Sequence, residues 1–266
     1  MSAGEIFFVR AAGHRLRGLR LGRWTGATPV LVLLHEGLGS IPQWRDFPEA
    51  LCRRCGLPGL VYERYGHGGS DPLDGPRPPD FLEREALEAL PDVLAACGIE
   101  RPVLVGHSDG GTIALLYASA FPERPVACIA EAAHVLLEPA TRSGARAVLD
   151  RWIGDADFRR RLTRFHGDGA EAMLRGWTQF WMAEERRNWS IVDRLGSIRC
   201  PVLAIQGERD DHGTRVHADE IVARVCGPAE ALILPNCGHV PHHEARAAVL
   251  EHIRVFVRTE VGRLAS

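Results

Sequence analysis

Six short apolar runs alternate with longer segments of helical character, and this alternation constrains the fold more than any other feature of the sequence. Each run is continuously apolar, as is typical of strands that helices cover on both faces. The runs occupy residues 29–35, 59–65, 102–107, 126–132, 201–207 and 230–236, and the helix candidates occupy 43–55, 80–97, 110–120, 214–226 and 243–259. The pattern predicts an α/β fold, a mostly parallel twisted sheet with helices on both faces.

Two segments depart from this alternation. Residues 5–22, EIFFVRAAGHRLRGLRLG, are typical of an antiparallel hairpin that leads into the sheet. Residues 133–197 hold no convincing strand, are arginine-rich and carry four of the six tryptophans. We therefore expect a core formed by residues 1–132 and 198–266, with 133–197 inserted as a helical lid. Its aromatic residues could form the core of the lid or the wall of a ligand pocket.

Charge and residue usage exclude several kinds of chemistry. A net charge of −2 over 266 residues argues against a general nucleic-acid binder, which would need a large basic excess. All 32 basic residues are arginine. Without lysine, a Schiff-base lysine, a phosphate-binding P-loop lysine and a Ser–Lys dyad are impossible.

The sequence contains no run typical of a signal peptide or a membrane-spanning helix, so we expect no membrane partner and a cytoplasmic location. Seven cysteines, an odd number, fit reduced thiols better than a disulfide framework. Cys52 and Cys55 form a C-x-x-C without a second pair at zinc-binding spacing, and we interpret them as helix residues. No metal or cofactor is expected.

The stretch Gly106-His107-Ser108-Asp109-Gly110 lies where a predicted strand ends and a predicted helix begins. This is the context of a nucleophile elbow, in which a strained turn exposes a serine. Flanking side chains would collide in such a turn, which explains Gly106 and Gly110. The N-terminus of the following helix directs free N–H groups toward the place where an oxyanion would form.

A serine nucleophile needs a base, and the base needs an orienting acid. His239 follows the last predicted strand, and Asp210 lies just beyond the end of another. The order Ser108, Asp210, His239 places each residue at the carboxyl end of a strand, as in hydrolases that use the elbow. Asp211 and Glu131 are the alternative acids, and Asp210 is preferred because it lies three residues after Gly207.

The chain resembles the α/β-hydrolase superfamily over nearly its whole length. LLHEGLGS resembles the oxyanion loop of that family, ERYGHGGSD its D-x-R-G-x-G-x-S turn, GHSDGG the elbow, GERD the acid turn and CGHVPHHE the histidine loop. The resemblance implies that Ser108 is the nucleophile, His239 the general base and then acid, and Asp210 its orienter. It also implies an oxyanion hole formed by the backbone N–H of Asp109 and that of Gly37, with Leu38 as the alternative to Gly37.

Two positions depart from the family pattern. Glu36 replaces the usual glycine after His35, and Tyr65 replaces the arginine of the turn. We expect Glu36 to pair with Arg64, although direct contact with substrate is the other interpretation. The carboxylates of Glu36 and Asp109 near the nucleophile should disfavour an anionic group at the reacting carbon.

Several further residues are candidates for the surroundings of the site. For substrate binding we consider Glu36, His134, Trp152, Trp177 and Trp181. Cys237 is interpreted as a small buried hydrophobe. His242 and His243 are interpreted as surface or helix-start residues rather than metal ligands, because no further ligands accompany them.

A serine nucleophile excludes the dehalogenase and epoxide-hydrolase branches, which the resemblance says use aspartate. The expected reaction is acyl transfer on a small-molecule carboxylic ester, with thioesters next and a small or medium hydrophobic acyl group. The alternative is hydrolysis of a carbon–carbon bond in a ring-cleavage product, since an arginine-rich lid could accept its carboxylates. A ligand-binding relative without turnover is the third reading, and the complete set of three residues argues against it.

Overall fold

The computed structural model describes residues 4–263 and contains one eight-stranded sheet with the strand order β1-β2-β4-β3-β5-β6-β7-β8. The first two strands form the expected hairpin, and β2 pairs antiparallel with β4. All the other neighbours are parallel, so the predicted mostly parallel α/β sheet is confirmed. The strands are β1 (Glu5–Ala11), β2 (His14–Leu21), β3 (Val30–Leu34), β4 (Gly59–Tyr62), β5 (Pro102–His107), β6 (Ala127–Glu131), β7 (Val202–Gly207) and β8 (Ala229–Leu234).

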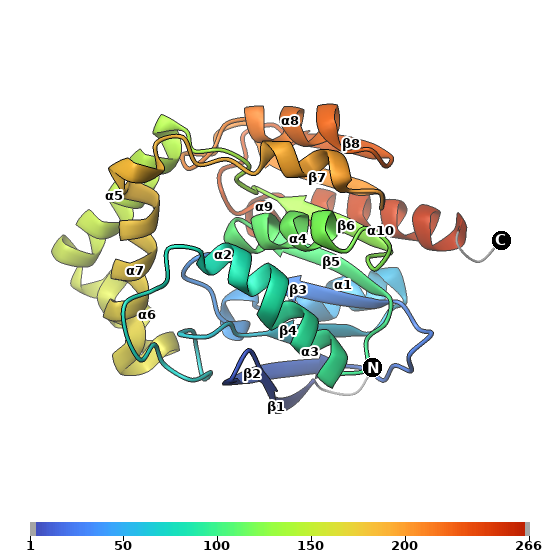
Figure 1. Cartoon of the computed structure of the whole chain (residues 1–266), viewed down its shortest axis with the longest axis horizontal. Helices are drawn as coiled ribbons and strands as arrows, with labels where there is room; N and C mark the ends of the chain where they lie inside the picture. Colours follow the sequence, from blue (N-terminus) through green and yellow to red (C-terminus); the bar gives the residue numbers. More distant parts are fainter. Residues whose placement is uncertain (1–3, 264–266) are drawn as a thin grey trace.

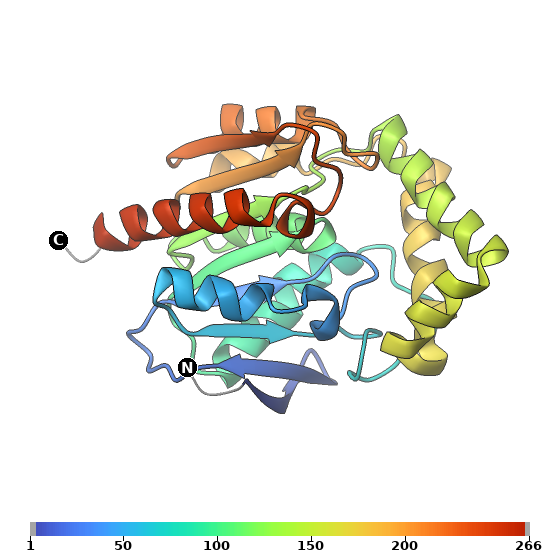
Figure 2. The ribbon, with the colours of Figure 1, turned by 180° about the vertical axis from the view of Figure 1, so that it is seen from behind.

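Helices cover both faces of the sheet (Figures 1 and 2). One face carries α1 (Phe47–Cys55) and α10 (Arg246–Arg263), which Figure 2 shows in front of the strands. The opposite face carries α3 (Leu90–Ala96), α4 (Asp109–Ala120) and α8 (Val216–Arg224). The remaining short helices of the core are η1 (Ile41–Trp44), α2 (Phe81–Arg84), η2 (Glu85–Ala89), η5 (Val192–Ser197) and α9 (Pro241–Glu244). The buried side chains accordingly form two main clusters, one on each face.

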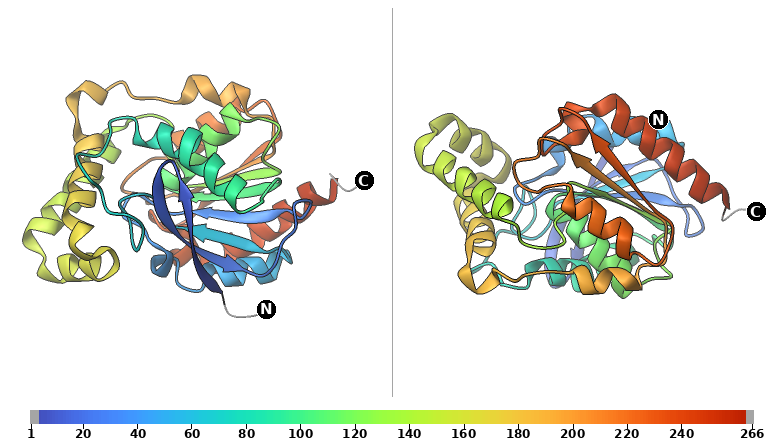
Figure 3. Two further views of the ribbon diagram at one scale, coloured as in Figure 1. Left: turned by 60° about the horizontal axis from the view of Figure 1, so that its bottom comes forward. Right: turned by 90° about the horizontal axis from the view of Figure 1, so that it is seen from above.

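Between β6 and β7 the chain leaves the sheet and forms three longer helices, α5 (Pro139–Gly154), α6 (Ala156–His166) and α7 (Ala170–Met182), which we call the helical insertion. The short turns η3 (Gly167–Gly169) and η4 (Glu184–Arg186) complete this segment. The insertion stands beyond one end of the strands (Figures 1 and 3). That end is the carboxyl edge of the sheet, because Gly37, just after β3, meets Trp177 of α7.

The base of the insertion is closed by main-chain pairing. Leu136 and Ser190 form an isolated antiparallel bridge, and the amide of Leu137 donates to the carbonyl of Trp189 at 3.0 Å. The division of the chain into a core and a lid spanning residues 133–197 remains a prediction. The outermost residues of the predicted core, 1–3 and 264–266, lie outside the described part.

Two predicted elements differ in detail from those observed. The run 230–236 is not a doubly covered strand, because β8 is the edge of the sheet and Glu230 and Ala231 are exposed. The final helix is interrupted, since α9 ends at Glu244 before α10 starts at Arg246. Among residues 4–263, no helix combines the length and the apolar character that crossing a bilayer requires.

Candidate active site

Ser108 lies in the turn between β5 and α4 with a backbone φ of 52° and ψ of −118°. Non-glycine residues rarely adopt such angles, so surrounding structure must hold the turn in place. The two flanking glycines permit this: a Cβ on Gly106 would overlap the main chain of Gly110, and one on Gly110 would overlap the carbonyl of Leu34. The local sequence thus forms the expected elbow, with Ser108 only 2% exposed.

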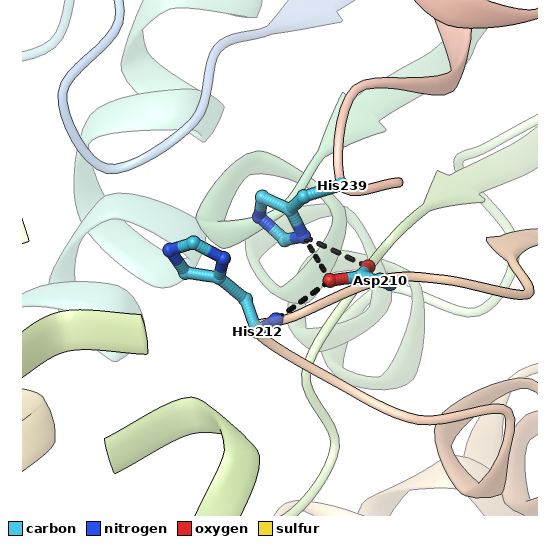
Figure 4. Close-up of side chains that lie close together, drawn as sticks. All are labelled: Asp210, His212 and His239. Carbon is cyan, nitrogen blue, oxygen red and sulfur yellow. Dashed lines mark hydrogen bonds and ion pairs between the residues drawn. The ribbon is translucent and has the colours of Figure 1, made fainter. Parts of the chain in front are cut away.

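Three side chains from separate strand ends form a continuous hydrogen-bonded chain. His239 Nε2 lies 3.0 Å from Ser108 Oγ, and His239 Nδ1 lies 2.9 and 2.8 Å from the two oxygens of Asp210. Figure 4 shows the bonds between Asp210 and His239. A proton on Nδ1 leaves Nε2 free to accept the serine proton. The arrangement can therefore activate a hydroxyl nucleophile.

The carboxylate of Asp210 is held by three other donors. Gln206 Nε2 donates to it at 2.7 Å, and the amides of His212 and Gly213 donate at 2.8 and 3.2 Å. Burial would raise the pKa of Asp210, but the hydrogen bond and charge of His239 lower it. Burial would likewise lower the pKa of His239, and the hydrogen bond and charge of Asp210 raise it. Asp211 is exposed and bonds His212, so Asp210 is the carboxylate that meets His239.

The loop after β3 lies opposite the elbow, and side chains from the segment after β4 bind its carbonyl groups. Arg64 donates to the carbonyls of His35 and Glu36 at 3.0 and 2.8 Å. His67 Nε2 lies 3.0 Å from the carbonyl of Gly37. In a planar trans peptide the following N–H points away from the carbonyl. The N–H groups of Gly37 and Leu38 therefore have fixed directions, as an oxyanion hole requires.

The expected ion pair between Glu36 and Arg64 is not formed. Arg64 is fully enclosed and binds main-chain carbonyls, whereas the Glu36 carboxylate lies 3.9 Å from His107 Nδ1. The side chain of Glu36 is 27% exposed. Partial burial nevertheless raises the pKa of the Glu36 carboxyl. The guanidinium of Arg64 binds the main-chain carbonyls of His35 and Glu36 in place of the Glu36 carboxylate.

The side chain of Asp109 is fully buried beneath two tryptophans of α7. Trp181 Nε1 donates to Asp109 Oδ1 at 3.3 Å, and the indole of Trp177 packs on Gly37. Burial raises the pKa of Asp109, which the charge of Arg64 partly opposes. Trp181 thus contacts Asp109, the residue that follows Ser108, and the pocket-wall role of Trp177 and Trp181 stays a prediction.

The other two candidates for substrate binding occupy different environments. His134 is buried, with its ring centroid 5.8 Å from that of His239 and 5.1 Å from that of Trp181. Its Nε2 donates to the carbonyl of His212 at 3.1 Å. Trp152, in contrast, packs in a small core of the insertion with Leu162, Ala170, Met173 and Leu174. That location supports the lid-core interpretation for Trp152.

Glu131 does not contact the candidate base. Its carboxylate instead accepts from the backbone amide of His242 at 2.6 Å and lies 2.9 Å from His242 Nδ1. The helix-start interpretation of His242 is correct, but the surface interpretation is wrong because His242 is buried. His243 is partly exposed. Cys237 is buried, and burial raises the pKa of its thiol to about 11, as expected of an inert cysteine.

Sequence reasoning missed three residues around the site. Gln206 supports Asp210, and the ring of His212 stacks on that of His239 with centroids 4.4 Å apart. His166 of α6 binds the loop after β3 through the carbonyl of Leu38. The sequence offered no signal for these contacts, since glutamine in a strand and histidine in a helix carry no motif.

Asp210, His212 and His239 bring potential metal ligands within 4.8 Å of one another (Figure 4). The rings of His212 and His239 are stacked, with an interplanar angle of 21°. Lone pairs of imidazole lie in the ring plane, so those of two stacked rings do not converge on one ion. The Asp210 oxygens and His239 Nδ1 already satisfy each other. The geometry suits proton transfer rather than metal binding.

Comparison with known proteins identifies the class. A family model described as the alpha/beta hydrolase family matches residues 31–252, and the chain therefore belongs to this family. Serine hydrolase BPHL of Mus musculus is 28% identical over 190 residues. The match covers 69% of this chain and 63% of that protein, so the chain spans less than two thirds of this relative.

Solved structures share the fold. A serine hydrolase involved in carbazole degradation (CarC) has a TM-score of 0.75 at 22% identity, covering 97% of this chain and 100% of that one. An enol-lactonase from Burkholderia xenovorans LB400 has a TM-score of 0.73 at 21% identity, covering 95% and 100%. At these identities the similarity establishes the architecture alone.

Proposed function

We propose that the protein is a serine hydrolase that cleaves carboxylic esters of small to medium hydrophobic acyl groups, with thioesters as the next substrate class. The hydrogen-bonded chain from Ser108 through His239 to Asp210 carries this proposal. In the proposed reaction Ser108 Oγ attacks the carbonyl carbon while His239 Nε2 takes the proton. His239 then protonates the departing alcohol, and water hydrolyses the acyl-enzyme by the same route.

The proposed oxyanion hole uses the backbone N–H of Asp109 and that of Gly37, with Leu38 as the alternative to Gly37. Asp109 is the first residue of α4, where the amide has no partner within the helix. The peptide directions fixed by Arg64 and His67 support the second donor. Two such donors stabilise the negative charge that develops on the carbonyl oxygen.

The proposed acyl pocket lies between the elbow and α7. Trp181 bonds Asp109, Trp177 packs on Gly37, and His134 would complete the wall beside His239. Glu36, partly exposed beyond His107, would meet the more polar part of a substrate. The helical insertion would then act as a lid that determines which acyl groups enter.

Hydrolysis of carbon–carbon bonds in ring-cleavage products is the alternative, which the arginine-rich insertion favours; one structural neighbour is a serine hydrolase involved in carbazole degradation. Many of those arginines, however, pair with acids on the surface, including Arg146 with Asp150 and Arg175 with Glu171. The carboxyl groups of Asp109 and Glu36 near the nucleophile would disfavour a substrate carboxylate. Ester hydrolysis is therefore preferred, and binding without turnover is the remaining possibility.

A fluorophosphonate probe tests the class of reaction. Labelling of Ser108, lost in Ser108→Ala, is expected of the hydrolase and would be absent from a binding protein. Turnover of p-nitrophenyl acetate and butyrate, measured beside a dienoate, then separates the ester from the carbon–carbon substrate. Turnover of the dienoate alone would overturn the ester assignment. An additional series of acyl-CoA thioesters ranks the second substrate class.

We also propose that the protein works in a reducing, cytoplasmic environment. All seven cysteines carry free thiols, and burial raises the pKa of Cys52 and Cys55 to about 12. Such thiols are poor nucleophiles and poor metal ligands. Fractionation of cells with an antibody to the chain tests the location.

A further inference from the structure

We propose that His166, which belongs to the helical insertion, is a positioning residue that holds the oxyanion loop in its active geometry. Its imidazole bridges two segments of the core. Nε2 donates to the carbonyl of Leu38 at 2.9 Å, and Nδ1 accepts from the amide of Gly68 at 2.9 Å. This inference rests on the function proposed above and extends it to the coupling between lid and catalysis.

The two hydrogen bonds of His166 require one particular tautomer of its ring. A neutral imidazole with its proton on Nε2 donates to Leu38 and accepts from Gly68 at the same time. His166 is only 6% exposed, and burial lowers its pKa to about 4, which keeps it neutral at ordinary pH. The ring that faces it, His67, lies edge-on with centroids 6.0 Å apart. The bridge is therefore a buried and fully matched pair of hydrogen bonds.

The bridge completes the support of the oxyanion loop. The carbonyls of Glu36 and Gly37 are held by Arg64 and His67, and His166 holds the next carbonyl, that of Leu38. Gly68, which His166 also binds, follows His67 directly in the chain. Loss of His166 would thus free the peptide after Leu38 and loosen the turn that carries His67. Both changes move the N–H groups of Gly37 and Leu38.

The insertion makes two further contacts with the same loop. The indole of Trp177 packs directly on Gly37, leaving no space for a Cβ there. The side chain of Leu38 packs against the small core that contains Trp152 and Leu162. The loop that would stabilise the oxyanion is consequently held between the core and the insertion. Displacement of the insertion would remove the contacts of His166, Trp177 and the Trp152 core and leave those of Arg64 and His67. Closure of the insertion would thus complete the support of the oxyanion loop.

The test compares substitutions of His166 with a matched change on the same helix. His166→Phe keeps an aromatic ring and removes both hydrogen bonds, whereas His166→Gln keeps one amide donor for the Leu38 carbonyl. Thr163→Ala changes an exposed residue of the same helix and leaves both bonds of His166 intact. With p-nitrophenyl butyrate we expect His166→Phe to lower kcat by about tenfold to a hundredfold, because misplaced catalytic groups lose this much. KM should change much less, and His166→Gln should recover part of kcat.

Hydrogen exchange supplies a readout that does not depend on hydrolysis. In His166→Phe the amide of Gly68 and those of residues 37–39 should exchange faster, whereas Thr163→Ala should leave their protection near that of the wild type. If His166→Phe matches Thr163→Ala in both kcat and exchange, the inference is overturned. A wild-type protein that a fluorophosphonate does not label would overturn the proposed function, and with it the catalytic part of this inference. In that case faster exchange in His166→Phe would still establish the anchoring of the loop.

Discussion

The carboxylate of Asp210 determines which nitrogen of His239 carries a proton. With both carboxylate oxygens within 2.9 Å of Nδ1, the proton stays there and Nε2 remains the acceptor for Ser108. An amide in place of the carboxylate can present an N–H to Nδ1 and favour the opposite tautomer.

We therefore expect Asp210→Asn to lower kcat with an ester substrate by about 10⁴-fold, as in other hydroxyl nucleophile–histidine–carboxylate sets. Asp211→Asn is the matched control, since Asp211 is exposed and bonds only its neighbour His212. Steady-state kinetics on p-nitrophenyl butyrate measures both variants. Equal losses in the two variants would contradict the assignment of Asp210.

The activity should also fall on acidification with a midpoint above the ordinary histidine value. Asp210 raises the pKa of His239, and only the neutral ring can accept the serine proton. Hence kcat/KM should be full above that pKa and fall tenfold per pH unit below it, with a midpoint above about 6.5. A pH–rate profile between about pH 5 and 8 measures this. A flat profile there would exclude His239 as the base.

The elbow glycines supply a test of stability. A Cβ on Gly110 would overlap the main-chain carbonyl of Leu34, which cannot move away as a side chain could. We expect Gly110→Ala to reduce the free energy of unfolding by about 1–3 kcal/mol or more, the range for overpacked sites. Gly154→Ala is the control, because a Cβ there meets nothing within 4 Å. Denaturant unfolding compares the two, and an unchanged Gly110→Ala would argue against the tight turn.

At the scale of elements, β6 supports the loop that carries His239. Glu131, the last residue of β6, binds both the amide and the ring of His242, three residues beyond His239. The buried carboxylate of Glu131 thereby holds this loop in place. His107 fixes the same loop from β5, since its Nε2 donates to the carbonyl of His239 at 2.7 Å.

Glu131→Ala should accordingly reduce the free energy of unfolding by about 1–3 kcal/mol, the cost of leaving a buried hydrogen-bond donor without its acceptor. Exposed Glu230 on β8 provides the control, and Glu230→Ala should be near neutral. Thermal and denaturant unfolding measure the difference. A small effect of Glu131→Ala would show that His242 finds another acceptor.

The elements that the sequence predicted well are those whose signals are local. Apolar runs and the spacing of Gly106, Ser108 and Gly110 depend on neighbours in the chain, so the strands and the elbow could be read directly. The edge position of β8 could not, because strand order is set by packing across the sheet. His166 meets Leu38 across 128 positions, and such contacts leave no local pattern. The predicted ion pair between Glu36 and Arg64 was wrong because a sequence does not show which main-chain carbonyls a side chain will bind.

At the scale of the whole molecule, the helical insertion is not a separate body. Trp177, Phe180 and Trp181 of α7 belong to the same buried cluster as Ala133 and the helices on one face of the sheet. Phe81 of α2 packs edge-on against Phe180, with centroids 4.8 Å apart. The cluster around Trp152 has its buried members in the insertion, and Leu38 of the loop after β3 packs against it. The insertion therefore shares part of its apolar packing, mainly that of α7, with the sheet domain.

Because α7 and the sheet domain share one buried cluster, we expect the insertion and the sheet to unfold together. Four of the six tryptophans lie between residues 152 and 189, so tryptophan fluorescence reports mainly on the insertion, while far-UV circular dichroism reports on all elements. In denaturant the two transitions should coincide, as for a single cooperative unit. Leu162→Ala, within the insertion, should lower both midpoints equally, because the loss of packing destabilises the whole domain.

A fluorescence transition that precedes the loss of circular dichroism would show instead that the insertion opens independently. In that case Leu162→Ala should shift the fluorescence transition and leave the circular dichroism transition unchanged. The oxyanion loop would then lose its contacts with Trp177 and His166 before the core unfolds, and esterase activity should disappear with the earlier transition.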